Sequence, residues 1–208
     1  MLAPMMPSAL VTHDKGTATH RGLLFVACAI VISSCSTPLD MTGARIALPG
    51  PEWGVVIGSV LVQPEGDGPD RVSGGKSFKF EVVQIQPGDP DGIRPYAEEY
   101  QLMAKAGEER IFVSRLRPGA YLIRSFHEAS VAGLGGDLDI VFSVNPGEVR
   151  YVGRLNIEIP RRAARGKDYR FTIENQRAQT LASVPPEHDA LANAAVDGPM
   201  QARVKPAS

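Results

Sequence analysis

Cysteine, histidine and aromatic residues are all scarce in this sequence of 208 residues. It contains two Cys, four His and 6% aromatic residues, with 22 basic against 23 acidic side chains. Two cysteines can form neither a disulfide scaffold nor a thiolate metal cage. Because the charges balance, the protein has no overall positive potential that would attract nucleic acid. The low aromatic content argues against a surface on which bases could stack. We therefore expect one globular domain with appendages and no nucleic-acid partner.

The apolar run at residues 23–32 is too short to cross a membrane. Ten helical residues extend about 15 Å, half of the ~30 Å hydrocarbon core. The run follows the basic residues Lys15 and Arg21, and this order of charge and apolar segment is typical of a signal peptide. Residues 1–34 are therefore interpreted as a signal sequence and excluded from the fold.

Cys35 follows directly, in the tetrapeptide Ile32-Ser33-Ser34-Cys35. The tetrapeptide resembles the lipobox of bacterial lipoproteins, in which an aliphatic and two small residues precede a cysteine that is acylated and becomes the new N-terminus. The resemblance implies lipidation of Cys35 and attachment to the lipid bilayer of the cell envelope, where several acyl chains give stable anchoring. In a Gram-negative host, Ser36 resembles a signal for sorting to the outer membrane, with the protein facing the periplasm.

Two alternatives remain at this end of the chain. Residues 1–34 also fit a plain secretory signal, with Cys35 as a buried structural residue of the mature protein. The long polar segment before the run favours Met5 or Met6 as the true first residue, which leaves the lipobox unchanged. Residues 35–52, rich in Pro and Gly, are expected to form a tether.

A hydrophobic period of two dominates residues 53–175 and predicts strands. No segment there has a helical period long enough for a crossover helix, which argues against a parallel sheet. The expected fold is an all-β, antiparallel two-sheet sandwich of seven or eight strands. The predicted strands cover residues 54–62, 77–85, 110–116, 120–128, 140–144, 149–159 and 169–174, while residues 98–105 fit either a strand or a helical turn. Within the long strand, alternation places Val149, Tyr151, Leu155, Ile157 and Ile159 on one face.

Pro118-Gly119 and Pro146-Gly147 predict reversals between antiparallel strands, because Pro pre-sets the first corner of a turn and Gly allows positive φ at the second. Residues 116–123, Leu-Arg-Pro-Gly-Ala-Tyr-Leu-Ile, resemble a hairpin of transthyretin-like and carboxypeptidase regulatory-like domains. The first predicted strand, with Gly58 inside it, is also similar to that group. The resemblance covers about residues 53–175 and implies a structural or binding module without a shared active site.

His127 is the only histidine in the predicted sandwich. Alternation places it on the same strand face as Tyr121, Ile123 and Ser125, and a partly buried, hydrogen-bonded role is favoured over a general base. A Ser-His-Asp arrangement is not supported, because no nucleophile motif accompanies it. Its candidate members are Ser125, Ser130, Asp137 and Asp139.

Metal ligands are equally sparse. After processing only His127 and His188 remain, with no further ligand at zinc spacing. Three acidic, Gly-rich segments at residues 65–70, 88–92 and 135–139 lack the calcium-loop pattern and are typical of turns. We expect no cofactor, no metal and no enzymatic activity.

A basic segment follows the long predicted strand and contains Arg161, Arg162, Arg165 and Lys167. In a membrane-tethered protein these residues are candidates for contact with anionic headgroups. The favoured alternative is a solvated turn that protects a sheet edge. Residues 176–208 are expected to hold a short helix from Pro186 to Ala195, docked loosely or not at all, and a disordered end.

Two functions fit these features. The first is a membrane-anchored envelope lipoprotein that acts as a non-enzymatic structural or protein-interaction module with an envelope protein as partner, for instance by pairing of an exposed sheet edge with an incoming strand. The alternative is binding of a glycan or peptidoglycan fragment. That site would use loops at residues 63–76 and 128–139 around Tyr96, Tyr100 or Trp53.

Overall fold

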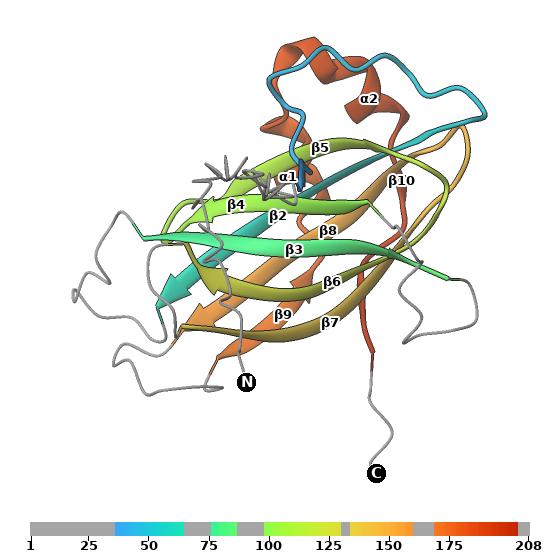
Figure 1. Ribbon diagram of the computed structural model, residues 1–208. Helices are drawn as coiled ribbons and strands as arrows, with labels where there is room; N and C mark the ends of the chain where they lie inside the picture. The colour runs from blue at the N-terminus through green and yellow to red at the C-terminus, as the bar shows by residue number, and fades with distance from the viewer. Residues whose placement is uncertain (1–35, 65–75, 87–97, 130–133, 160–168, 204–208) are drawn as a thin grey trace, which may run out of the picture. The chain divides into compact units, whose positions relative to one another are not determined.

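The computed structural model describes residues 36–64, 76–86, 98–129, 134–159 and 169–203, which form two facing sheets (Figure 1). Sheet A has the strand order β1-β4-β3-β6-β7-β11, and sheet B has the order β10-β8-β2-β5, with β9 also paired to β8. The strands are β1 (Thr37–Pro38), β2 (Gly54–Pro64), β3 (Ser77–Ile85), β4 (Glu99–Lys105), β5 (Arg110–Leu116), β6 (Gly119–Glu128), β7 (Gly135–Val144), β8 (Val149–Ile159), β9 (Arg170–Glu174), β10 (Val196–Asp197) and β11 (Gln201–Ala202). The predicted all-β sandwich is confirmed, and eight of the described strands are longer than two residues.

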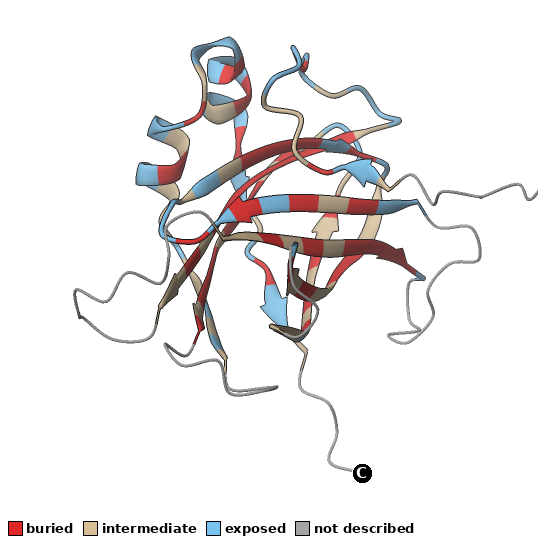
Figure 2. Cartoon of the chain, turned by 60° about the vertical axis from the view of Figure 1, so that its left-hand side comes forward, coloured by how far each residue is buried: buried red, intermediate tan, exposed pale blue. Residues whose placement is uncertain are grey.

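The main core lies between the sheets and follows from the alternation. Phe78, Phe80 and Val82 point inward from β3, while the residues between them are less buried. Burial alternates in the same way along β4, as Figure 2 shows. Aromatic rings fill much of the space between the sheets, with Tyr121 stacked on Phe142 at 5.4 Å between ring centroids.

The sheets are mixed, so the prediction of purely antiparallel pairing is wrong. β2 and β8 run parallel from Val55 opposite Val149 to Pro64 opposite Ile159. Parallel neighbours need a long connection rather than a tight turn. Here strands β3 to β7 supply it, and a crossover helix is unnecessary.

Both Pro-Gly turns connect one sheet to the other and not neighbouring strands of one sheet. Pro118-Gly119 leads from β5 in sheet B to β6 in sheet A, and Pro146-Gly147 leads from β7 back to β8. Gly147 adopts φ +70°, as the turn chemistry requires. At the first turn, the hydroxyl of Tyr121 donates to the carbonyl oxygen of Arg117 at 2.8 Å.

A β-bulge in β8 divides the face that alternation had predicted to be continuous. The register with β2 jumps from Tyr151 to Gly153, which leaves Val152 as the extra residue. Gly153 has φ +96°, a conformation that glycine tolerates best. Residues before the bulge, such as Tyr151, pack on the outer side of sheet B, whereas Leu155 and the later apolar residues enter the main core.

A second register shift, in β6 at Arg124, affects His127 in the same way. Tyr121 and Ile123 point into the main core, but after the shift Phe126 does so, and Ser125 and His127 are only half-buried. One extra residue inverts the facing of every side chain that follows. The prediction of one shared face for these residues is therefore wrong.

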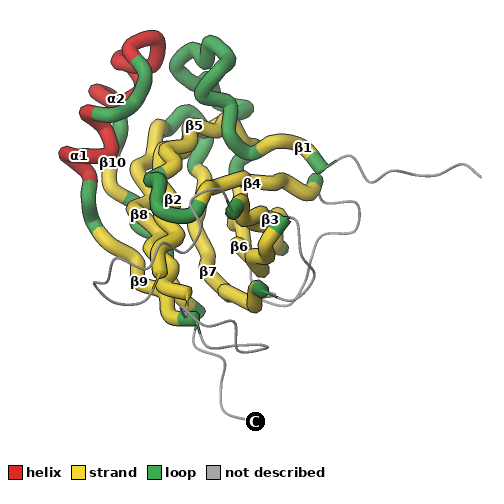
Figure 3. Tube along the Cα trace, turned by 90° about the vertical axis from the view of Figure 1, so that its left-hand side faces the viewer, coloured by secondary structure: helices red, strands yellow, loops and turns green. Residues whose placement is uncertain are grey.

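Three short helices cover part of the outer face of sheet B (Figure 3). They are α1 (Arg177–Ala182), the 3-10 helix η1 (Pro186–His188) and α2 (Asp189–Ala194). Leu191 of α2 is 1% exposed and packs with Ile46, Val55 and Tyr151 in a second apolar cluster. The helix predicted near Pro186 is confirmed, but it is docked firmly.

Both ends of the described chain close an edge of the sandwich. At one edge β1 pairs with β4 of sheet A, and the Met41 N–H then donates to Val113 of β5 in sheet B at 2.9 Å. At the other edge β10 pairs with β8 and β11 pairs with β7, with Met200 buried between them. Residues 36–52, expected as a tether, and residues 200–203, expected to be disordered, are thus built into the fold.

Candidate functional site

The site residues singled out by sequence lie outside the described part of the structure. These are Cys35, Arg161, Arg162, Arg165 and Lys167. Their described neighbours still locate them along the chain. Ser36 directly precedes β1, whereas Ile159 and Arg170 flank the basic segment at the far end of β8 from Val149.

Ser125 and Asp139, two of the residues considered for a Ser-His-Asp arrangement, have other partners, and Ser130 lies outside the described residues. The Ser125 hydroxyl donates to the carboxylate of Glu81 at 2.9 Å, and Arg124 donates to the same oxygen at 2.8 Å. The hydrogen bond from Arg124 is the main reason that the pKa of Glu81 is lowered. Asp139 receives the guanidinium of Arg203. Ser125 is therefore not activated by His127.

The third acidic, Gly-rich segment, residues 135–139, serves the fold. Asp139 has φ +56° in the irregular stretch of β7, and its backbone oxygen accepts from the Arg203 N–H at 2.9 Å. Across the described ranges, no group of three or more His, Cys, Asp or Glu side chains is placed to hold a metal ion. The other two acidic segments lie outside those ranges.

A polar network occupies the outer face of sheet B beside the helices. The guanidinium of Arg154 contacts Glu174 of β9 at 3.1 Å and Glu109 at 3.6 Å, and Ser59 donates to Glu109 at 2.7 Å. The Arg154 hydrogen bond is the main cause of the lowered pKa of Glu174. A general acid needs a raised pKa, so Glu174 is suited to holding Arg154 and not to proton donation.

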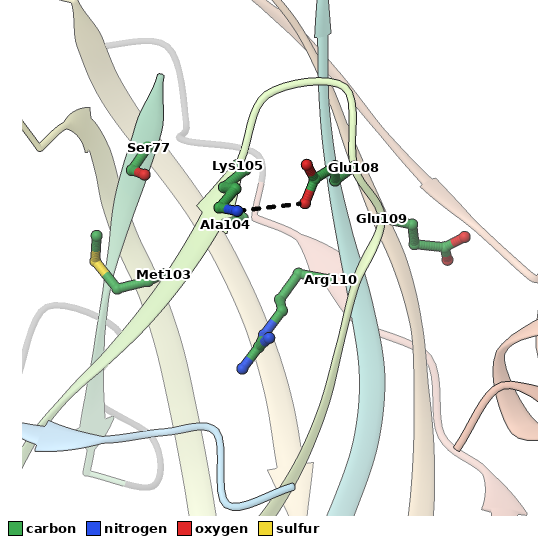
Figure 4. Close-up of a pocket in the computed structure, with 7 residues that line it drawn as sticks. All are labelled: Ser77, Met103, Ala104, Lys105, Glu108, Glu109 and Arg110. Carbon is green, nitrogen blue, oxygen red and sulfur yellow. Dashed lines mark ion pairs between the residues drawn. The ribbon is translucent and has the colours of Figure 1, made fainter. Parts of the chain in front are cut away.

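A hollow of about 310 Å³ lies at the open edge between β4 and β5. In Figure 4, Arg110 points between β4 and β5, Met103 lies on the other side of the β4 ribbon, and Lys105 is directed towards Glu108 at the turn, 3.9 Å away. Met103 is 44% exposed, one of few large apolar side chains open to solvent in the described structure. The hollow therefore offers one apolar contact among charged groups.

The backbone of β4 beside this hollow is paired with a described strand on one side only, by β3. The Leu39 N–H donates to the Gln101 carbonyl at 2.7 Å, which shows that Gln101 presents its backbone to the outer edge. Because backbone groups alternate along a strand, Met103 and Lys105 present theirs to the same edge. β1 covers only Tyr100 and Gln101, and the Lys105 carbonyl accepts from the Glu108 N–H at 3.3 Å. Among the described residues, the second half of β4 is therefore open for pairing at the backbone of Met103 and the N–H of Lys105.

A cation-π cluster lies at the end of the sandwich where β2 begins. Arg115 and Arg117 place their guanidinium carbons 4.4 and 5.2 Å from the centre of the Trp53 ring. Both arginines are exposed and Trp53 is half-buried. The sequence did not reveal this cluster, because it depends on the pairing of Gly54 with Leu116 in neighbouring strands.

The features proposed for glycan binding are separated in space. Residues 63–76 begin at the C-terminal end of β2, and residues 128–139 connect β6 to β7. Trp53, in contrast, directly precedes the N-terminal end of β2. The 11 residues of β2 span about 33 Å at ~3.3 Å each. Tyr100 is 6% exposed and cannot stack on a sugar, while Tyr96 lies outside the described residues.

Comparisons with known proteins return no family model, no curated protein and no solved structure that matches this chain. The resemblances of residues 32–35 and 116–123 therefore stay predictions. Within the described residues, no helix has the length and hydropathy needed to cross a bilayer.

Proposed function

We propose that the protein is a lipid-anchored component of a bacterial cell envelope, attached through acylated Cys35, that acts as a structural or protein-interaction module without enzymatic activity. The order of basic residues, ten-residue apolar run and Ile32-Ser33-Ser34-Cys35 carries this proposal. A sandwich that begins two residues after Cys35 supports it, because the folded body would then sit at the membrane surface.

The intact mass of the protein extracted from membranes tests the anchor. We expect the mass of residues 35–208 plus acyl groups, and we expect Cys35→Ala to remove the acyl mass and release the protein from the membrane fraction. An unmodified Cys35, or a C35A variant that stays equally membrane-bound, would refute the proposed anchor.

The open half of β4 is the best-supported place for a protein partner. An incoming extended segment would lie along the edge of β4 next to β1 and bond to the backbone of Met103 and the N–H of Lys105, the mode known as strand addition. The exposed Met103 side chain and the charges around the hollow would add selectivity.

Site-specific photo-crosslinking in intact cells tests this surface. A crosslinker at the exposed position 105 should capture one reproducible envelope protein, and a crosslinker at the exposed position 43 serves as the matched control. Met103→Pro should abolish the capture, because proline removes the N–H that faces the open edge. Equal capture from both positions would exclude β4 as the interface.

A further inference from the structure

The first strand fixes where an acyl group on Cys35 can be. Only Ser36 separates Cys35 from β1, and two extended residues reach at most about 7 Å. β1 runs parallel to β4, with Thr37 opposite Tyr100. The chain therefore enters β1 from the end at which β4 begins, and Ser36, the residue to which Cys35 is bonded, lies at that end of the sandwich.

A continuous set of contacts joins this end to Trp53. The ring of Tyr100 lies 6.1 Å from that of Tyr121, and the Tyr121 hydroxyl binds the carbonyl of Arg117 at 2.8 Å. Arg117 in turn lies over Trp53. The first strand and the cation-π cluster thus occupy the same end of the molecule.

The side chains at this end suit the boundary between water and lipid. An indole is apolar over most of its area and polar at its N–H, which favours the headgroup region. Arg115 and Arg117 are exposed, and within the described structure neither has a carboxylate at ion-pair distance.

We infer that the surface formed by Trp53, Arg115 and Arg117, the Trp53 face, rests on the bilayer that holds the acyl chains. Its arginines pair with the phosphates of anionic phospholipids, and its indole enters the headgroup region. This inference rests on the proposed lipid anchor. Glu52, which is exposed and precedes Trp53 in the chain, weakens the attraction between this surface and anionic lipids because its carboxylate is negatively charged.

The basic segment containing Arg161, Arg162 and Arg165 would give the opposite orientation. Its described neighbours, Ile159 and Arg170, lie at the end of β8 that is remote from Val149. The 11 residues of β8 span about 33 Å, well beyond the reach of Ser36. The two basic regions therefore make different predictions about which end meets the membrane.

Trp53 is the only tryptophan of the chain, so its fluorescence reports the orientation directly. The acylated protein is reconstituted into vesicles of phosphatidylglycerol and phosphatidylethanolamine that carry a phospholipid brominated near the headgroup. We expect quenching by the brominated lipid and protection from aqueous acrylamide. R115Q/R117Q should lower the equilibrium constant for contact between the Trp53 face and the bilayer about fivefold per arginine. R115K/R117K keeps both charges and should retain the contact, and Glu52→Gln should strengthen it.

R161Q/R162Q/R165Q is the matched control, since it removes cations from the other basic region and should leave the Trp53 signal unchanged. Thermal unfolding establishes that each variant is folded. If Trp53 of the acylated protein stays open to acrylamide and is not quenched by brominated lipid, the proposed contact of the Trp53 face with the bilayer is wrong. The contact is also wrong if R161Q/R162Q/R165Q loses the lipid quenching while R115Q/R117Q keeps it. A chain that carries no acyl mass instead refutes the proposed anchor, so the two failures are distinguishable.

Discussion

The ring Nε2 of His188 lies 3.1 Å from the carbonyl oxygen of Thr42. A carbonyl only accepts, so Nε2 carries the proton and donates. His188 is fully buried in η1, and among the described residues its Nδ1 has no hydrogen-bond partner. This contact joins the helices of the C-terminal region to the segment that follows β1, across 146 positions of the chain.

Replacing His188 with alanine should destabilise the fold markedly. The change removes a buried hydrogen bond, leaves the Thr42 carbonyl unpaired and opens a cavity, which together cost about 2–4 kcal/mol. Urea denaturation measures the loss. His127→Ala, at a half-buried position on the other sheet, is the control and should cost less than about 1 kcal/mol. If both substitutions lower the free energy of unfolding by the same amount, the buried contact between His188 and Thr42 does not stabilise the fold as proposed.

Met200→Ala should lower the free energy of unfolding by about 2–5 kcal/mol. Met200 is 3% exposed and belongs to the main core, although it lies near the end of the chain. Gln201→Ala, at the neighbouring exposed position, should change stability by less than about 0.5 kcal/mol. A Met200→Ala protein as stable as the wild type would mean that the C-terminal segment does not close the sandwich edge in solution.

Gly58→Ala tests the close packing of β2 against its neighbours. A Cβ at this position would lie 2.7 Å from the Phe112 ring and 2.8 Å from a Val152 methyl group. Overpacking of this kind costs about 1–3 kcal/mol. Adding Val152→Ala should recover part of the loss, because it removes the clashing methyl group, and a double-mutant cycle measures the coupling. Strict additivity would contradict the proposed contact.

The Arg154–Glu174 pair should make stability fall in acid. The pKa of Glu174 is lowered in the folded state, chiefly by the hydrogen bond from Arg154. The pair therefore stabilises the fold above the ordinary glutamate pKa of about 4.3, and this contribution is lost as pH falls through the lower folded value.

Glu174→Gln isolates this contribution. Urea midpoints measured from about pH 7 to about pH 3 should show a variant that is less stable at neutral pH and loses less stability on acidification. Parallel curves for the two proteins would assign the acid sensitivity to other carboxylates, with Glu81 and its partner Arg124 as the next pair to test.

The predicted strands follow closely from local pattern. The strand bounds at residues 77–85, 110–116 and 149–159 match β3, β5 and β8 residue for residue. β7 begins earlier than predicted, because its first residues are Gly135-Gly136 and an aspartate, a composition that is typical of a loop. Pairing with β6 overrides that local preference.

The candidate site was less predictable. Cys35 and the basic segment are short linear motifs and are readable without a fold, but they lie outside the described residues. The Trp53 face brings together residues more than 60 positions apart, such as Trp53 and Arg117, and no local pattern relates them. The open half of β4 depends on how far β1 extends along that strand, which local pattern does not show either.

The sequence by itself determined that this is a strand-built domain with turns at its Pro-Gly pairs, because alternation and turn chemistry act over a few neighbouring residues. Only the tertiary structure decided which way the residues beyond Val152 and Arg124 point, that β2 and β8 run parallel, and that both chain ends close the sandwich. A bulge inserts one residue relative to a partner strand, and the partner is chosen by burial of the whole core. Such choices depend on contacts between distant segments, which a periodic pattern does not record.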